Sequence, residues 1–246
     1  MINIGDNIYV PRSRLGMDSD APSALVRTKV QARHKRTLTV DVPEAEGRTC
    51  DVPSSSVHKD LAIYVITIGD YRTETSVLSP LTSSITSFCS LLLPPDAFQH
   101  RFVRSTAELE HYWNLEHRAY SHVILIAHGS ETGLEFAVDG DVRVADFVSL
   151  LGRPNPEPKI VLSLCCQTGR KAFARPISRA RFCKAFIAPF QSVHGAVASE
   201  FMQAFLGQHL LGGHSVKVAF NKAGIELPGK ESFRYWQDGH LGKLVG

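Results

Sequence analysis

Two short stretches of the sequence carry side chains that could perform chemistry. The first, VILIAHG, ends in His128 and Gly129, and the second, IVLSLCCQTG, places Cys165 and Cys166 before a Thr-Gly pair. Each follows an apolar run typical of a strand buried on both faces. A thiol and an imidazole that meet form the minimal pair for nucleophilic acyl transfer, in which the imidazole takes the thiol proton and later donates it to the leaving group.

The spacing of the two stretches allows such a meeting. His128 precedes Cys166 by 38 residues, which is enough for a hairpin and a crossover helix between two neighbouring parallel strands. The carboxyl ends of parallel strands lie at one edge of the sheet, where ligands gather in α/β proteins. We therefore expect the thiol and the imidazole to face each other at that edge.

The order of elements from residue 59 onward is typical of an α/β sheet, because apolar strand-like runs alternate with helical patterns. The expected strands are 61–69, 98–103, 121–127, 159–164 and 184–189, the expected helices are 76–93, 105–117, 145–152 and 194–213, and a hairpin with an Asp-Gly turn is expected at 134–144. Ser105 and Glu108 are spaced as a capping box at a helix start. The pattern predicts a mostly parallel sheet flanked by helices.

Residues 1–58 follow a different pattern. Short runs alternate apolar and polar side chains between turn residues, which is the period of half-buried strands. Five such strands in under sixty residues look like a small SH3-like β-barrel, a recognition or docking module that would bind a regulatory protein partner. We expect two domains, at 1–58 and 59–246.

Composition narrows the classes of function. An apolar fraction of 43% and a charged fraction of 21% are normal for a globular protein, and a net charge of +3 is too small for a dedicated nucleic-acid binder. No apolar run is long enough to cross a bilayer, and no signal-peptide pattern is present. The five cysteines include no C-x-x-C pair, which favours reduced thiols in the cytoplasm. No metal and no cofactor are expected.

Several blocks together resemble a known family. VILIAHGSETGLEF, the Asp-Gly hairpin and VLSLCCQTG are similar to the His-Gly and Cys-x-Thr-Gly blocks of CHAT-domain peptidases, which are caspase-like cysteine peptidases of clan CD. The stretch from Cys183 to Ala223 looks like the end of the same domain, so the resemblance covers roughly Leu61 to Ala223. It implies a caspase-like fold and a cysteine endopeptidase that cleaves proteins or peptides. Bacterial relatives often belong to defence or signalling systems.

The resemblance also implies roles for individual residues. The Cys-x-Thr-Gly block begins at Cys166, which makes this residue the nucleophile, with His128 as acid and base. The N–H groups of Gly129 and Cys166 would form the oxyanion hole. Cys165 is the alternative nucleophile, because counting from the preceding strand points one residue earlier. Asp70, which ends the first strand of the sheet, is the candidate for a substrate pocket that favours Arg or Lys.

The same residues allow other interpretations. Adjacent cysteines on a strand diverge and no second ligand pair accompanies them, which argues against zinc. A hydrolase elbow requires glycine two residues either side of the nucleophile, but Leu164 and Thr168 flank Cys166. A non-catalytic caspase-like scaffold that binds a peptide or protein partner is the alternative function. The basic stretch 167–182 is expected to be a solvated mobile loop beside the cleft.

Overall fold

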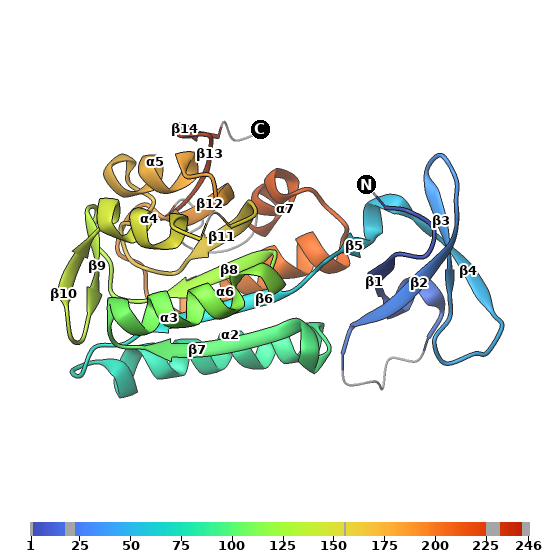
Figure 1. Cartoon of the computed structure of the whole chain (residues 1–246), viewed down its shortest axis with the longest axis horizontal. Helices are drawn as coiled ribbons and strands as arrows, with labels where there is room; N and C mark the ends of the chain where they lie inside the picture. Colours follow the sequence, from blue (N-terminus) through green and yellow to red (C-terminus); the bar gives the residue numbers. More distant parts are fainter. Residues whose placement is uncertain (1, 18–22, 155, 225–231, 243–246) are drawn as a thin grey trace.

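The first part of the chain forms a small antiparallel sheet (Figure 1). The computed structural model describes residues 2–17, 23–154, 156–224 and 232–242. Its first strands are β1 (Asn7–Pro11), β2 (Leu25–Arg33), β3 (Thr37–Asp41), β4 (Thr49–Pro53) and β5 (His58–Lys59), with the short helices α1 (Arg12–Leu15) and η1 (Ser54–Ser56) between them. The strand order is β4-β3-β2-β1-β5. The first half of β2 pairs with β1 and its second half pairs with β3, with a bulge in the second half between Val30 and Ala32. The likeness to SH3 barrels stays a prediction.

The larger sheet has seven strands within the described part of the chain, in the order β14-β13-β12-β11-β8-β6-β7. They are β6 (Ile63–Ile68), β7 (Phe98–Val103), β8 (His122–Ile126), β11 (Lys159–Ser163), β12 (Cys183–Pro189), β13 (Phe233–Gln237) and β14 (His240–Leu241). The five strands from β12 to β7 are parallel, whereas β13 and β14 extend the sheet with antiparallel pairing. The mostly parallel sheet is as predicted, and the antiparallel edge was not expected from the sequence.

Helices cover both faces of this sheet. The helices α2 (Ser79–Leu92), α6 (Gly195–Leu206) and α7 (Val216–Ala223) share one apolar core with it, and α3 (Thr106–Glu116), α4 (Val144–Gly152) and α5 (Lys171–Arg179) share another. The short turns are η2 (Glu74–Leu78), η3 (Pro95–Ala97), η4 (His117–Ala119) and η5 (Gly207–Leu211). Consecutive strand residues alternate between the two cores, as Ile124 and Leu125 do, because side chains along a strand point to opposite faces. None of the described helices is long and apolar enough to span a bilayer.

The small sheet packs against the larger region instead of standing apart (Figure 1). Tyr9 and Leu25, on β1 and β2, belong to the apolar core that contains α2 and α6. The imidazole Nε2 of His58 lies 2.9 Å from the backbone oxygen of Leu210. The carboxyl ends of the parallel strands point away from this junction, toward the hairpin of β9 (Gly133–Phe136) and β10 (Gly140–Arg143).

The basic stretch 167–182 is not the solvated mobile loop that its charges suggested. It contains α5, in which Phe173, Ala174 and Ile177 are fully buried against the sheet. These residues lie one and four positions apart, so they share one face of a helix while the charged side chains take the other. Pro176, which is unusual inside a helix, obscured this period in the sequence.

Only one of the two hydrogen bonds of the predicted capping box is formed at the start of α3. Ser105 Oγ accepts a hydrogen bond from the Glu108 N–H at 3.1 Å. The Glu108 carboxylate does not return the bond to Ser105, because it accepts from the Arg104 N–H at 2.6 Å. One cap hydroxyl therefore covers an N–H group at the start of the helix.

We expect Ser105→Ala to lower the free energy of unfolding by about 1 kcal/mol, because the N–H group that the hydroxyl covers would lose its partner. Urea denaturation measures this change. Ser87→Ala, on the exposed face of α2, is the control and should raise the free energy of unfolding by a few tenths of a kcal/mol, since alanine favours the helix interior. Equal and small changes in both variants would contradict the capping role.

Candidate active site

Three neighbouring strands end at one edge of the sheet, and each is followed by a side chain suited to catalysis. Asp70 follows β6, His128 follows β8, and the cysteine pair follows β11. Because β8 lies between β6 and β11 in the sheet, His128 stands between the carboxylate on one side and the thiols on the other. The topology thus arranges acid, imidazole and thiol in a row.

The register of β8 and β11 brings the imidazole and the second thiol to the same level. Leu125 pairs with Ser163 in the parallel ladder. Three further residues along each chain lead to His128 and Cys166. The register therefore places His128 and Cys166 at corresponding positions beyond the two strands, but Cys166 Sγ contacts the backbone oxygen of Val193 and His128 Nε2 contacts Asp70 and Thr73. The direct meeting of thiol and imidazole stays a prediction.

Gly129 marks the point where the two loops touch. A Cβ atom at this position would lie 2.8 Å from Cys165 Cβ and 2.9 Å from the backbone oxygen of Cys166, which is closer than side chains approach. Both Gly129 and Cys166 are partly exposed, and within the described residues neither N–H group has a hydrogen-bond acceptor. Two unpaired amide donors therefore lie in adjoining loops.

The two cysteines occupy different environments. Cys165 is fully buried among the side chains of α4 and α5, and its Sγ lies 3.6 Å from the backbone oxygen of Leu125. Burial raises the pKa of the Cys165 thiol to about 12. Cys166 is partly exposed, and its Sγ lies 3.8 Å from the backbone oxygen of Val193. Cys166 is therefore the more solvent-exposed residue of the pair.

A closed ring of hydrogen bonds shapes the loop that carries Cys166. The Cys165 N–H donates to Ser163 Oγ at 3.2 Å, the Ser163 hydroxyl lies 2.8 Å from Thr168 Oγ1, and the Thr168 hydroxyl donates to the Cys165 oxygen at 2.7 Å. Within this loop, Gln167 adopts a φ of 62°. The left-handed region costs a residue with a side chain about 1–2 kcal/mol, so the surrounding bonds must hold the turn in place.

Further along the loop, Gly169 is held by the strands β12 and β13. Its N–H donates to the Pro189 oxygen at 2.7 Å, and its own oxygen accepts from Trp236 Nε1 at 3.0 Å. A Cβ atom here would lie 2.5 Å from the Ala188 oxygen. Glycine is required because β12 approaches the loop so closely.

His128 is oriented by a carboxylate and a hydroxyl. Its Nε2 lies 3.1 Å from Asp70 Oδ2 and is hydrogen-bonded to Thr73 Oγ1. The Thr73 hydroxyl donates its proton to Asp70 Oδ2 at 2.7 Å, so Thr73 accepts from the imidazole. Nε2 therefore carries the ring proton, and Nδ1 of the neutral ring keeps a lone pair. The His128 side chain is 35% exposed.

The carboxylate of Asp70 is buried and accepts several hydrogen bonds. Its Oδ1 accepts from the N–H groups of Arg72 and Thr73 at 2.6 and 2.5 Å, and the residue is 4% exposed. Burial opposes ionisation, but the hydrogen bonds from Thr73 and Arg72, with the charge of His128, outweigh it and lower the pKa of Asp70. The structure thus places Asp70 beside the imidazole, whereas its role in a substrate pocket stays a prediction.

Sequence reasoning missed Asp70 as a partner of the histidine, and it did not consider Thr73. The available signal was the position of Asp70 at the end of a buried strand. The sequence does not reveal the strand order, in which β6 is the direct neighbour of β8.

A pocket adjoins His128 on the side of the β9–β10 hairpin. It has a volume of about 300 Å³ and is lined by His128, Gly129, Ser130, Glu135, Gly140 and Asp141. Glu135 is paired with Arg72 at 2.6 Å. His194, which follows Val193 near the thiol, is exposed and accepts a hydrogen bond from the Ala196 N–H at 3.2 Å. Among the residues that the structure describes, no three His, Cys, Asp or Glu side chains are grouped to hold a metal ion.

Comparisons with known proteins bear on the fold. No protein-family model and no curated protein sequence matches the chain. A secreted C11 cysteine protease from Bacteroides thetaiotaomicron, solved in complex with an irreversible peptide inhibitor, matches with a TM-score of 0.51 and 10% identity. The match covers 72% of this chain and 66% of that one, which is less than two thirds of its length. At this identity the likeness concerns the fold, a mixed α/β arrangement around a mainly parallel sheet that is similar to that of a cysteine protease.

Proposed function

We propose that the chain is a caspase-like cysteine peptidase in which Cys166 is the nucleophile and His128 the acid and base. The observation that carries the proposal is that Asp70, His128 and Cys166 directly follow the carboxyl ends of three adjacent strands. The partial exposure of Cys166, next to a fully buried Cys165, supports the choice of nucleophile. The likeness of the fold to a cysteine protease is in keeping with it.

The mechanism would proceed by acyl transfer. His128 Nδ1 takes the proton of the Cys166 thiol, and the thiolate attacks the peptide carbonyl. The oxyanion of the tetrahedral intermediate accepts hydrogen bonds from the Gly129 and Cys166 amides. The imidazolium then gives its proton to the departing amine, which leaves an acyl-thioester. A water molecule, deprotonated by His128, hydrolyses the thioester and frees the thiol.

Asp70 and Thr73 would act as positioning residues. Their bonds to Nε2 keep the ring proton on that nitrogen and leave Nδ1 free as the base. The negative charge of Asp70 also stabilises the imidazolium that forms during the reaction. The substrate-pocket role that the sequence suggested for Asp70 stays a prediction beside this one.

The finer assignments belong to the same proposal. Membership of the CHAT-domain family rests on the His-Gly and Cys-x-Thr-Gly blocks. The five bent antiparallel strands of the first sixty residues support an SH3-like module that docks a regulatory protein, with a domain boundary near residue 58. All five cysteines are free, which suits a reducing cytoplasm.

The proposal predicts selective alkylation. With iodoacetamide near neutral pH, Cys166 should react first, whereas Cys165 should react at least a hundredfold more slowly, because it is buried and its raised pKa keeps it protonated. Mass spectrometry of tryptic peptides over time measures both rates. His128→Ala is the control and should slow only the reaction of Cys166. Equally slow labelling of both thiols would favour the non-catalytic scaffold.

Loss of either member of the dyad should abolish cleavage. Incubation of a denatured protein mixture with the wild-type chain should create new N-termini, and Cys166→Ala and His128→Ala should reduce their formation by about 10³-fold or more. Quantitative mass spectrometry of N-termini measures this. Cys165→Ala should retain cleavage within about tenfold, because this side chain only packs. Cleavage that persists in Cys166→Ala but vanishes in Cys165→Ala would move the nucleophile by one residue.

Asp70→Asn should lower kcat/KM by about 10²–10⁴-fold, since the amide can hold the wrong tautomer of His128. The same variant tests the lowered pKa of Asp70. A folded-state pKa below the unfolded value of about 3.9 stabilises the protein above that pH and loses its effect as the pH falls through the folded value. The difference in unfolding free energy between wild type and Asp70→Asn should therefore shrink between about pH 5 and pH 3.

Asp146→Asn, on the exposed side of α4, is the matched control for both measurements. This substitution should leave kcat/KM unchanged. The difference in unfolding free energy between wild type and Asp146→Asn should be the same at every pH in this range. A pH-independent difference for Asp70→Asn would contradict the assignment of an ionised carboxylate beside the imidazole.

A further inference from the structure

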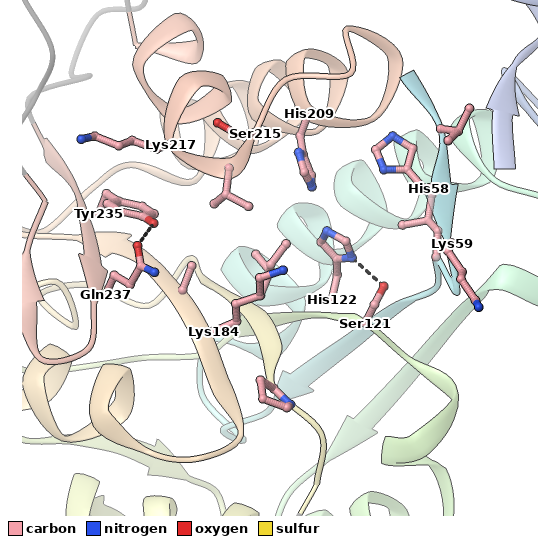
Figure 2. A pocket seen from close by; sticks show the side chains of 16 residues that line it. His58, Lys59, Ser121, His122, Lys184, His209, Ser215, Lys217, Tyr235 and Gln237 are labelled. Atoms are coloured by element: carbon pink, nitrogen blue, oxygen red, sulfur yellow. Dashed lines mark hydrogen bonds between the residues drawn. The ribbon is translucent and has the colours of Figure 1, made fainter. Parts of the chain in front are cut away.

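A second and larger pocket lies at the opposite end of the parallel strands (Figure 2). It has a volume of about 550 Å³, within the range of small-molecule sites. Its wall combines the segment that leaves the small sheet at residues 57–61 with the starts of β8, β11 and β12, the turn η5, the first residues of α7 and the strand β13. Parts of the chain far apart in sequence thus build one cavity.

The side chains that line this cavity are basic or apolar. The described lining residues include three histidines and three lysines but no aspartate and no glutamate. Leu61, Ile160, Ala185 and Val216 supply apolar surface. A cavity with this lining suits a molecule that combines an apolar body with a negative charge.

One polar atom in the pocket lacks a partner. His122 is 4% exposed and its Nδ1 lies 2.9 Å from Ser121 Oγ, whereas its buried Nε2 has no hydrogen-bond partner among the residues that the structure describes. Buried polar atoms are nearly always paired, because an unpaired one loses its bond to water without compensation. In Figure 2 the ring of His122 extends from β8 toward His209, among the side chains that line the cavity. A bound group could supply the missing bond.

A free positive charge lies close to this atom. Figure 2 shows the ammonium of Lys184 directed into the cavity between His122 and Tyr235. Within the described chain no carboxylate lies within ion-pair distance of Lys184, whereas Lys59 is paired with Asp6 at 2.8 Å. Burial lowers the pKa of His122 and lowers that of His209 to about 4, and the charge of Lys184 lowers both further. The exposed Lys184 side chain, which lines the cavity, thus has no carboxylate partner among the described residues.

The three histidines do not constitute a metal site. His58, His122 and His209 have ring centroids 5.4–5.5 Å apart in successive pairs, but the described residues contain no metal-binding group of three or more such side chains. His58 Nε2 and His209 Nδ1 are moreover engaged with backbone oxygens of Leu210 and His214. An anion is the occupant that the charges favour.

We propose that this pocket binds a small organic phosphate monoester. Its phosphate lies against the Lys184 ammonium and accepts a hydrogen bond from His122 Nε2, and its organic part packs on the apolar wall near Ile160 and Val216. A phosphate suits the site because it carries up to two negative charges and three acceptor oxygens, which match several cationic and N–H donors at once. The volume exceeds that of a bare phosphate and leaves room for the organic part.

The test is a calorimetric titration of the full chain with adenosine 5′-monophosphate as the probe. Two control ligands are titrated in parallel: adenosine, which lacks the phosphate, and inorganic phosphate, which lacks the organic part. We expect saturable binding of the monophosphate, no binding of adenosine, and weaker binding of inorganic phosphate. NMR of ring-labelled histidines should show a change at His122 on binding of the monophosphate.

Lys184→Gln should weaken binding of the monophosphate by about tenfold or more, because a charge-assisted bond is lost. Lys35→Gln, an equal change on an exposed hairpin of the small sheet, should leave the affinity unchanged. Equal melting temperatures without ligand would show that both variants fold.

Three results would overturn the proposal: no saturable binding at millimolar monophosphate, equal affinity for adenosine or inorganic phosphate, or equal effects of the two lysine substitutions. Because the titration needs no peptidase activity, its outcome is independent of the function proposed for Cys166.

Discussion

The parallel pairing of β8 with β11 is the constraint on which the candidate site depends. Neither His128 nor Cys166 lies in a strand, yet both extend from strands whose register is fixed by the pairing of Leu125 with Ser163. If β11 were shifted by two residues relative to β8, Cys166 would move by about 6.6 Å along the strand direction relative to His128. A separation of that size is beyond the reach of direct proton transfer. A slip of one residue would turn an entire apolar face of a buried strand toward the wrong core. Packing on both faces therefore holds the geometry of the edge.

The cysteine pair shows how one local sequence serves both packing and chemistry. Cys165 fills the core beneath α4 and α5, and this anchors the residue that follows it at the surface. The turn then requires an unfavourable backbone conformation at Gln167, held by the bonds among Ser163, Cys165 and Thr168. Strain of this kind persists where the surroundings determine the conformation more strongly than local preference does.

Local patterns were sufficient for the elements that the sequence predicted correctly. The strand 98–103 matches β7, and the hairpin with its Asp-Gly turn matches β9 and β10, because apolar period and turn residues act over a few positions. The helix α5 was missed because Pro176 and a high density of basic residues obscured its buried face. The partnership of Asp70 with His128 and the addition of β13 to the sheet depend on strand order. Strand order comes from contacts between distant segments, which no window of the sequence contains.

The bond from Trp236 to the oxygen of Gly169 has a consequence for synthesis of the chain. The indole belongs to β13, some seventy positions after the cysteine pair, so a growing polypeptide makes the cysteine turn long before it makes the strand that braces it. On the ribosome, the small amino-terminal sheet and the parallel strands emerge first, while the turn still lacks its indole support. A nascent chain can therefore form the bond from Trp236 to Gly169 only after β13 has been synthesised, so the loop that carries Cys166 reaches its final set of contacts later than the strand that precedes it.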